Sequence, residues 1–186
     1  MAKKQMMAHI TAMTKVTTDI YSMWLRVEGI ASEAVPGQFI SLYCNNEDRL
    51  LPRPISICEI NREEELLRLV FRVVGKGTEE FSHLQPGDTI KVLGPLGNGF
   101  PLQEGKAILI GGGIGIPPML QLAKELPGDV TVVLGYRDDD LFLKEDFEPY
   151  ANVVISTEDG SVGTKGNVID AIQEEKLEGS VVYSCG

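Results

Sequence analysis

The sequence is poor in the residues that build disulfide frameworks and most metal centres. Its 186 residues include only three cysteines and two histidines. Cys44, Cys58 and Cys185 lie far apart, without a Cys-x-x-Cys pair, so neither a disulfide framework nor a metal site is expected. The two histidines have no cysteine or carboxylate partner at ligand spacing, which favours surface or structural roles.

Positive charge and long apolar runs are also scarce. The 17 lysines and arginines are outnumbered by 27 aspartates and glutamates, which gives a formal net charge of -10 and a pI near 4.7. Because nucleic acids and anionic membranes attract basic surfaces, neither is an expected partner. No apolar run reaches membrane-spanning length and the N-terminal segment lacks the apolar core of a signal peptide, so a cytoplasmic location is expected.

A glycine-dense junction that follows a short apolar run is the most informative feature present. Residues 107–110 (AILI) predict a buried strand, and residues 111–119 (GGGIGIPPM) predict a turn that opens onto a helix. Glycine lets a pyrophosphate approach backbone N–H groups, and Pro117 suits the first helical turn. Only Gly111 and Gly113 match the G-x-G-x-x-G fingerprint, so an ordinary strand-to-helix turn is the alternative at this point.

The first half of the chain has the pattern of short antiparallel strands. Apolar and polar residues alternate over residues 21–27 and 67–73, which is the period of half-buried strands. Further strands are expected near Ile10, Phe39, Ile57 and Ile90, with Pro-Gly pairs marking turns. We therefore predict a six-stranded antiparallel β-barrel, with a short helix over residues 78–84, in a domain that spans residues 1–100.

The second half alternates strands with helices. Strands are expected over residues 107–110, 130–135, 152–155 and 181–184. Helices are expected over residues 117–126, 141–148 and 167–175. This alternation predicts a parallel sheet with crossover helices, an α/β nucleotide-binding domain over residues 101–186. Ligands in such sheets lie beyond the carboxyl ends of the strands, where the 111–115 loop and residues 185–186 would be placed.

Four motifs in a fixed order resemble a known superfamily. They are Arg53-Pro54-Ile55-Ser56, Val70-Phe71-Arg72 followed by Gly75-Lys76-Gly77-Thr78, the glycine loop, and the terminal Tyr183-Ser184-Cys185-Gly186. This set is similar to the ferredoxin-NADP reductase superfamily, in which a flavin-binding β-barrel precedes a nicotinamide-binding α/β domain. Within it, essentially the whole chain resembles the family of electron-transfer subunits of NAD-dependent (class B) dihydroorotate dehydrogenase.

The resemblance implies an oxidoreductase subunit that binds FAD and NAD. A hydride would pass between flavin N5 and nicotinamide C4 without a protein acid or base. The implied partner is the FMN-containing catalytic subunit that oxidises dihydroorotate in pyrimidine biosynthesis, within a heterotetramer. Relatives also hold a [2Fe-2S] cluster on four cysteines beyond this stretch, so that cluster is expected only in the full-length protein.

The resemblance places FAD on the barrel motifs. Arg53 would bind the pyrophosphate, Ser56 would reach flavin N5, and Ile55 would take the place of a stacking tyrosine. The expected FAD-binding residues are Arg53, Pro54, Ile55, Ser56, Val70, Phe71, Arg72, Gly75, Gly77 and Thr78. Val70 to Arg72 would contribute backbone groups, whereas the Thr78 hydroxyl would help to hold the pyrophosphate. From the residues alone, Arg53 could also be a solvated edge-strand side chain, and Thr78 could be the N-cap of a plain glycine turn.

The second domain carries the expected NAD site. Its residues are Gly111, Gly112, Gly113, Gly115, Tyr136, Arg137, Asp138, Cys185 and Gly186. The three carboxylates at 138–140 would repel a 2′-phosphate and accept a ribose hydroxyl, which favours NAD, although a solvated acidic turn is the alternative. Cys185 is the one catalytic candidate, since the resemblance implies that it sits near the nicotinamide; a packing cysteine is its alternative.

Two other functions stay open at this point. The chain could be the NAD(P)H-oxidising subunit of another iron-sulfur flavoprotein, of the ferredoxin-NADP transhydrogenase or sulfite reductase type. It could also be a module that binds FAD or NAD without turnover. Rapid flavin reduction by NADH would exclude the non-catalytic module.

Overall fold

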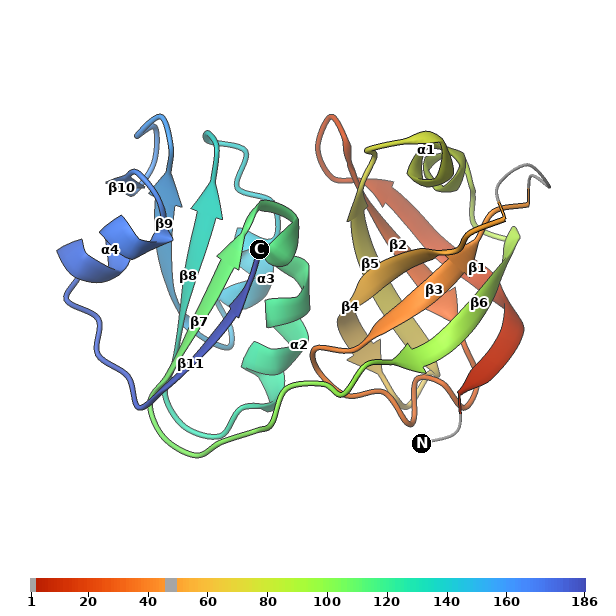
Figure 1. The fold of residues 1–186 in the computed structure, drawn as a ribbon, viewed down its shortest axis with the longest axis horizontal. Coiled ribbons are helices and arrows are strands. Elements are labelled where there is room, and N and C mark those ends of the chain that lie inside the picture. The colour runs from red at the N-terminus through yellow and green to blue at the C-terminus, as the bar shows by residue number, and fades with distance from the viewer. Residues whose placement is uncertain (1–2, 46–49) are drawn as a thin grey trace. The chain divides into compact units, whose positions relative to one another are not determined.

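The computed structural model describes residues 3–45 and 50–186, and the chain divides into two compact units, Met1–Gly99 and Phe100–Gly186 (Figure 1). The division falls one residue before the boundary expected from the sequence. Across the described ranges, no helix has both the length and the apolar character needed to cross a membrane.

The first unit is a closed barrel of six antiparallel strands in the order β1-β2-β5-β4-β3-β6. The strands are β1 (Lys4–Lys15), β2 (Ile20–Arg26), β3 (Phe39–Tyr43), β4 (Arg53–Asn61), β5 (Leu66–Arg72) and β6 (Thr89–Leu96). One short helix, α1 (Lys76–Ser82), follows β5. This architecture confirms the six-stranded barrel predicted from the alternating pattern.

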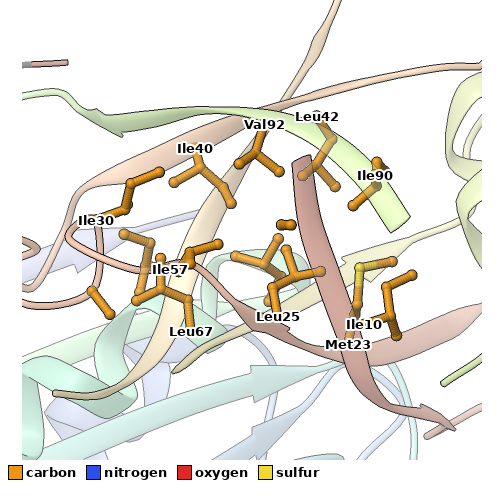
Figure 2. Packing of buried hydrophobic residues seen from close by; sticks show 14 of the residues in the cluster. Ile10, Met23, Leu25, Ile30, Ile40, Leu42, Ile57, Leu67, Ile90 and Val92 are labelled. Atoms are coloured by element: carbon orange, nitrogen blue, oxygen red, sulfur yellow. The ribbon is translucent and has the colours of Figure 1, made fainter. Parts of the chain in front are cut away.

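Alternation along the strands fills the barrel with aliphatic side chains. Figure 2 shows Ile10, Met23, Leu25, Ile40, Leu42, Ile57, Leu67, Ile90 and Val92 packed together within the barrel. Phe71 lies in the same core and meets Phe81 of α1 edge-on, with ring centroids 6.3 Å apart. Full burial of such a side chain stabilises the fold by about 1.5–3 kcal/mol. Helix α1 is therefore held against the barrel by apolar packing.

The second unit is a parallel sheet in the order β10-β9-β8-β7-β11. Its strands are β7 (Ala107–Gly112), β8 (Val130–Tyr136), β9 (Asn152–Thr157), β10 (Thr164–Lys165) and β11 (Val181–Cys185). Its helical elements are η1 (Gly113–Gly115), α2 (Pro117–Glu125), α3 (Lys144–Phe147) and α4 (Val168–Glu174). The predicted parallel α/β architecture is confirmed, with β10 as an additional strand too short for a periodic pattern to reveal.

Helix α3 corrects the expected helix over residues 141–148. Leu143 has a left-handed backbone (φ 64°), and the N–H of Leu141 bonds to the Asp139 carbonyl at 3.0 Å, so a turn occupies the expected first residues. Helix α4 instead begins where the sequence indicates. There Asn167 accepts from the Ile169 N–H at 2.8 Å and caps the helix.

The first residues of the second unit are bound to strand β11. The Tyr183 hydroxyl donates to the Pro101 carbonyl at 2.7 Å and accepts the Gln103 N–H at 3.1 Å. The Tyr183 ring also meets Phe100 edge-on, at 5.7 Å between centroids. Three contacts therefore attach the Phe100–Gln103 segment to the strand that ends at Cys185.

Candidate functional site

The barrel strands β4 and β5 separate where the first two motifs lie. Their register begins at Ile57↔Leu69 and continues to Asn61↔Leu66, with a bulge between Ile57 and Glu59. Residues 53–56 pair instead with β3, and residues 70–72 pair with β2. In the described residues, the two strand ends thus face each other without a shared ladder. Their backbone N–H and C=O groups are suited to bind the polar edge of a flat ring.

Arg53 and Gly77 meet at one end of this opening. A Cβ atom at Gly77 would lie 2.6 Å from the Arg53 Nε atom and 3.0 Å from Cζ, closer than atoms pack. The Arg53 guanidinium therefore rests on the backbone of α1, and it also donates to the Leu51 carbonyl. The structure brings together two motifs that are separated by more than twenty residues. A cation beside the first turn of a helix is a suitable setting for a phosphate.

Thr78 shapes this loop and is not the helix N-cap. Gly75 is the N-cap, and Thr78 is the third helical residue. The buried Thr78 hydroxyl donates to the Gly75 carbonyl at 3.0 Å and accepts the N–H groups of Val74 and Gly75 at 3.0 and 3.3 Å. These bonds correct the N-cap interpretation, whereas the expectation that this hydroxyl helps to hold a pyrophosphate stays a prediction. Thr78 fixes the backbone that would hold the ligand.

The other expected FAD residues differ in what they can offer. Pro54 is exposed, Ser56 is half-buried, and Ile55 packs against the barrel core. Val70 and Phe71 are 3% and 1% exposed, so only their backbone groups can reach a ligand. This agrees with the role expected for them, which remains a prediction.

Arg72 has a partner that the sequence did not reveal. Its Nε atom lies 3.2 Å from the Asp19 carboxylate, and the Val73 N–H bonds to the Asp19 carbonyl at 2.8 Å. The Asp19 side chain in turn accepts from the Thr17 hydroxyl at 3.2 Å. Asp19 belongs to the β1–β2 turn, and no local motif marks it. Because strand pairing alone places it beside Arg72, only the fold could identify this contact.

In the second unit, the glycine loop has one packed side and one open side. Gly111 is packed, since a Cβ there would lie 2.9 Å from the Ile116 Cα atom. A Cβ at Gly112 or Gly113 would meet no atom within 4 Å, and Gly113 has a left-handed backbone (φ 50°). Helix α2 follows directly, with proline at its first positions. The open side of the loop thus leaves room for a phosphate against the backbone.

The order of the strands places a topological switch point beside this loop. From β7 the chain continues through β8 and β9 to β10 on one side, and it then returns to the other side of β7 as β11. Ligands in open α/β sheets bind beyond the carboxyl ends of the strands at such a point. The carboxyl ends of β7 and β11 are the glycine loop and Cys185, and Cys185 pairs with Gly111. The loop and the terminal Cys-Gly, both predicted from the sequence, therefore lie together.

Cys185 is half-buried at the end of β11, and burial raises the pKa of its thiol. The thiol is therefore protonated near neutral pH. A neutral thiol suits a packing or positioning role beside a ligand better than nucleophilic attack.

Tyr136 has a structural role that the sequence did not predict. Its ring meets Phe142 edge-on at 5.6 Å, and its hydroxyl donates to the Phe142 carbonyl at 2.9 Å. Burial and the negative charge of Asp140 raise the pKa of Tyr136 far above its ordinary value. The Tyr136 side chain, which the sequence placed at the NAD site, thus stabilises the turn over residues 137–142 through its contacts with Phe142.

The acidic turn itself is exposed. Arg137 and Asp138 lie on the surface just after β8, and the Asp138 carboxylate accepts the Asp140 N–H at 3.1 Å. This local bond leaves the second carboxylate oxygen of Asp138 toward solvent. Both alternatives from the sequence, ribose binding and a solvated turn, are compatible with this geometry.

Comparisons with known proteins bear on both units. Residues 7–100 match the family model described as "Oxidoreductase FAD-binding domain". The dihydroorotate dehydrogenase B (NAD(+)) electron transfer subunit of Listeria monocytogenes is 44% identical in an alignment 181 residues long, which covers 93% of this chain and 71% of that protein. The protein of the same name from Shouchella clausii is 41% identical, over 100% of this chain and 75% of its own length.

Solved structures agree with the fold. An NADH-dependent reduced ferredoxin-NADP oxidoreductase is similar with a TM-score of 0.88 and 33% identity, over 96% of this chain and 67% of that chain. A ferredoxin NADP+ reductase from Neisseria gonorrhoeae, solved with FAD and NADP, has a TM-score of 0.77 and 17% identity, over 97% of this chain and 84% of that chain. At that lower identity, the second likeness shows the fold alone.

Proposed function

Because the chain belongs to the family of electron-transfer subunits of dihydroorotate dehydrogenase B (NAD+), we propose that its barrel holds FAD at the Arg53–Gly77 contact and that its second unit holds NAD at the switch point. The observation that carries this proposal is the meeting of Arg53 with Gly77. The contact brings a guanidinium to the start of a helix. Within the described residues, Arg53 donates to the Leu51 carbonyl and has no carboxylate partner.

The barrel residues fit FAD by their chemistry. Arg53 offers a planar, permanently charged donor set that can bind a pyrophosphate through two parallel hydrogen bonds. The first intrahelical bond of α1 runs from the Glu79 N–H to the Gly75 carbonyl at 2.9 Å, so the preceding N–H groups point out of the helix end. The separated ends of β4 and β5 would bind the ring edge with backbone groups. Ser56, next to the bulge, supplies one hydroxyl there.

The second unit fits a dinucleotide in the same way. The open faces of Gly112 and Gly113 would bind the pyrophosphate through the backbone, and Asp138 would accept a ribose hydroxyl. Bound together, FAD and NAD would supply hydride transfer between the flavin and nicotinamide rings. The protonated Cys185 thiol would pack at the nicotinamide end and keep water from it.

The names of the relatives support a proposal for the physiological partner. An electron-transfer subunit requires a catalytic subunit, which we propose is the FMN-containing enzyme that oxidises dihydroorotate in pyrimidine biosynthesis, assembled as a heterotetramer. The three cysteines of this stretch cannot supply the four thiolates of a [2Fe-2S] cluster, so we place no such cluster on these residues.

The 33% identical structure supports a second candidate function. That structure is of a ferredoxin-NADP oxidoreductase, an enzyme that exchanges electrons with a different partner. The higher identity to the Listeria and Shouchella subunits favours the dihydroorotate enzyme. The two candidates share the cofactor sites and differ only in the partner.

Purification and reduction of the chain test the proposal. The protein should bind one FAD, and NADH should bleach the flavin absorbance in a stopped-flow mixing experiment. Arg53→Ala should purify with little FAD, whereas Arg62→Ala, which removes a barrel arginine outside both motifs, should keep it. A wild-type protein that binds no added FAD would refute the proposal.

A further inference from the structure

The closest backbone approach at the switch point involves Gly115. A Cβ atom at this position would lie 2.3 Å from the Cys185 carbonyl oxygen, 2.5 Å from its carbonyl carbon and 2.6 Å from the Gly186 Cα atom. The glycine loop and the Cys185–Gly186 segment are therefore in direct backbone contact. No side chain separates them.

The need for glycine at residue 115 comes from this approach and not from backbone conformation. The left-handed residue of the loop is Gly113 (φ 50°), whereas Gly115 does not have a positive φ. An L-residue could thus adopt the backbone of Gly115 without strain. The space taken by Cys185 and Gly186 is what excludes a side chain.

The atoms that oppose Gly115 cannot move aside easily. They belong to the backbone, so rotation of a side chain does not relieve the overlap. Cys185 is held in register with Gly111 by the parallel ladder, and two residues earlier Tyr183 is tied to Pro101 and Gln103. An added methyl group would therefore displace the end of β11 or the loop.

We propose that Gly115 is a positioning residue for Cys185: its missing side chain sets the distance between the nucleotide-binding loop and the thiol at the nicotinamide end. This proposal rests on the proposed function for its catalytic consequence. Its structural part, the placement of Cys185 by Gly115, can be measured without any cofactor. Cys185 is half-buried, and this burial raises the pKa of its thiol. A displaced Cys185 should therefore differ from the wild type in its exposure and its reactivity, which can both be measured.

Gly115→Ala tests the proposal, with Gly179→Ala as the matched control. Gly179 also lacks a positive φ, and its Cβ would lie 2.8 Å from Ile108 Cγ1 and 3.0 Å from the Lys106 carbonyl. It thus carries a milder overlap, mainly with a side chain, just before β11 and away from the loop. The first readout is the rate at which iodoacetamide alkylates Cys185 at a series of pH values. Peptide mass mapping monitors this rate, with the alkylation of Cys44 as the internal reference. The second is the rate of flavin reduction by NADH.

We expect Gly115→Ala to expose Cys185, to lower its apparent pKa toward the ordinary value and to speed its alkylation several-fold at neutral pH. Flavin reduction should slow by about 10²-fold, the order of loss that a misplacement of 1 Å causes, with the FAD content unchanged. Gly179→Ala should change neither readout. Unaltered Cys185 alkylation in Gly115→Ala, or an equal change in Gly179→Ala, would overturn the proposal. A wild-type flavin that NADH does not reduce would instead refute the proposed function and leave the alkylation result to decide.

Discussion

Gly77→Ala is the most informative single substitution in the barrel, because it should separate cofactor binding from folding. Alanine is a better helix former than glycine by about 1 kcal/mol in a helix interior, and Gly77 lies in the first turn of α1. The three nearest atoms that the new methyl group would meet all belong to the Arg53 guanidinium, at 2.6 to 3.1 Å. The far end of a flexible side chain can move. The free energy of unfolding should therefore stay equal or rise slightly.

The loss of affinity can be worked from the same contact. A hydrogen bond to a charged group contributes about 1.5–3 kcal/mol, and displacement of Arg53 removes that contribution from the bound pyrophosphate. Since each 1.4 kcal/mol is about a tenfold change in the equilibrium constant, FAD should bind roughly 10- to 100-fold more weakly. The measurement is a titration of the apoprotein with FAD, in which quenching of the flavin fluorescence reports binding.

A double-mutant cycle with Arg53→Ala shows whether the effect passes through the arginine. Once Arg53 has been removed, the methyl group at residue 77 no longer has a guanidinium to displace, so Gly77→Ala should cause no further loss of FAD affinity. If the loss were the same in both backgrounds, the methyl group would be blocking the ligand directly. That result would refute the reasoning from the Arg53–Gly77 contact.

Three further outcomes are expected. Gly112→Ala should leave the thermal unfolding temperature unchanged or slightly higher, because its Cβ points into open space. NADH binding, measured by calorimetry, should nevertheless weaken, and an unchanged affinity would show that no phosphate approaches residue 112. Tyr136→Phe should lower the free energy of unfolding in urea by about 1–2 kcal/mol, because it removes the hydrogen bond to the Phe142 carbonyl. Folding raises the pKa of Tyr136, so the stability that its hydroxyl contributes is complete below the ordinary tyrosine pKa of 10.0 and is lost as pH rises above that value. The difference in stability between the wild type and Tyr136→Phe should therefore shrink in alkali. Asp19→Asn should cost less than about 1 kcal/mol, since both partners of its ion pair with Arg72 are partly exposed, and a larger loss would mean that Asp19 also orders the β1–β2 turn.

The sequence was sufficient to predict the two architectures because each has a distinct period. Alternation over residues 67–73 indicates a half-buried strand, and the AILI run before Gly111 indicates a buried parallel strand, irrespective of distant contacts. The start of α4 was also predictable, since Asn167 caps it locally. The left-handed backbone of Leu143 was not, because a leucine carries no signal for that conformation.

The candidate site was predictable in its motifs and not in its contacts. Glycine at residues 75 and 77 indicated a phosphate loop, but the placement of Arg53 against Gly77 depends on how strands far apart in the sequence pair. For the same reason, neither the bond from Tyr136 to Phe142 nor the ion pair of Asp19 with Arg72 could be inferred. The need for glycine at 115 comes from a strand seventy residues later, which no local pattern encodes.

The attachment of Tyr183 to Phe100, Pro101 and Gln103 has a consequence for protein engineering. A chimaera that joins this barrel to another reductase module would sever all three contacts if its crossover point fell between residues 103 and 106. Fusion immediately after Gly99 would transfer the docked segment together with the strand that retains it. Exchange of modules at that junction should therefore conserve the integrity of both parts.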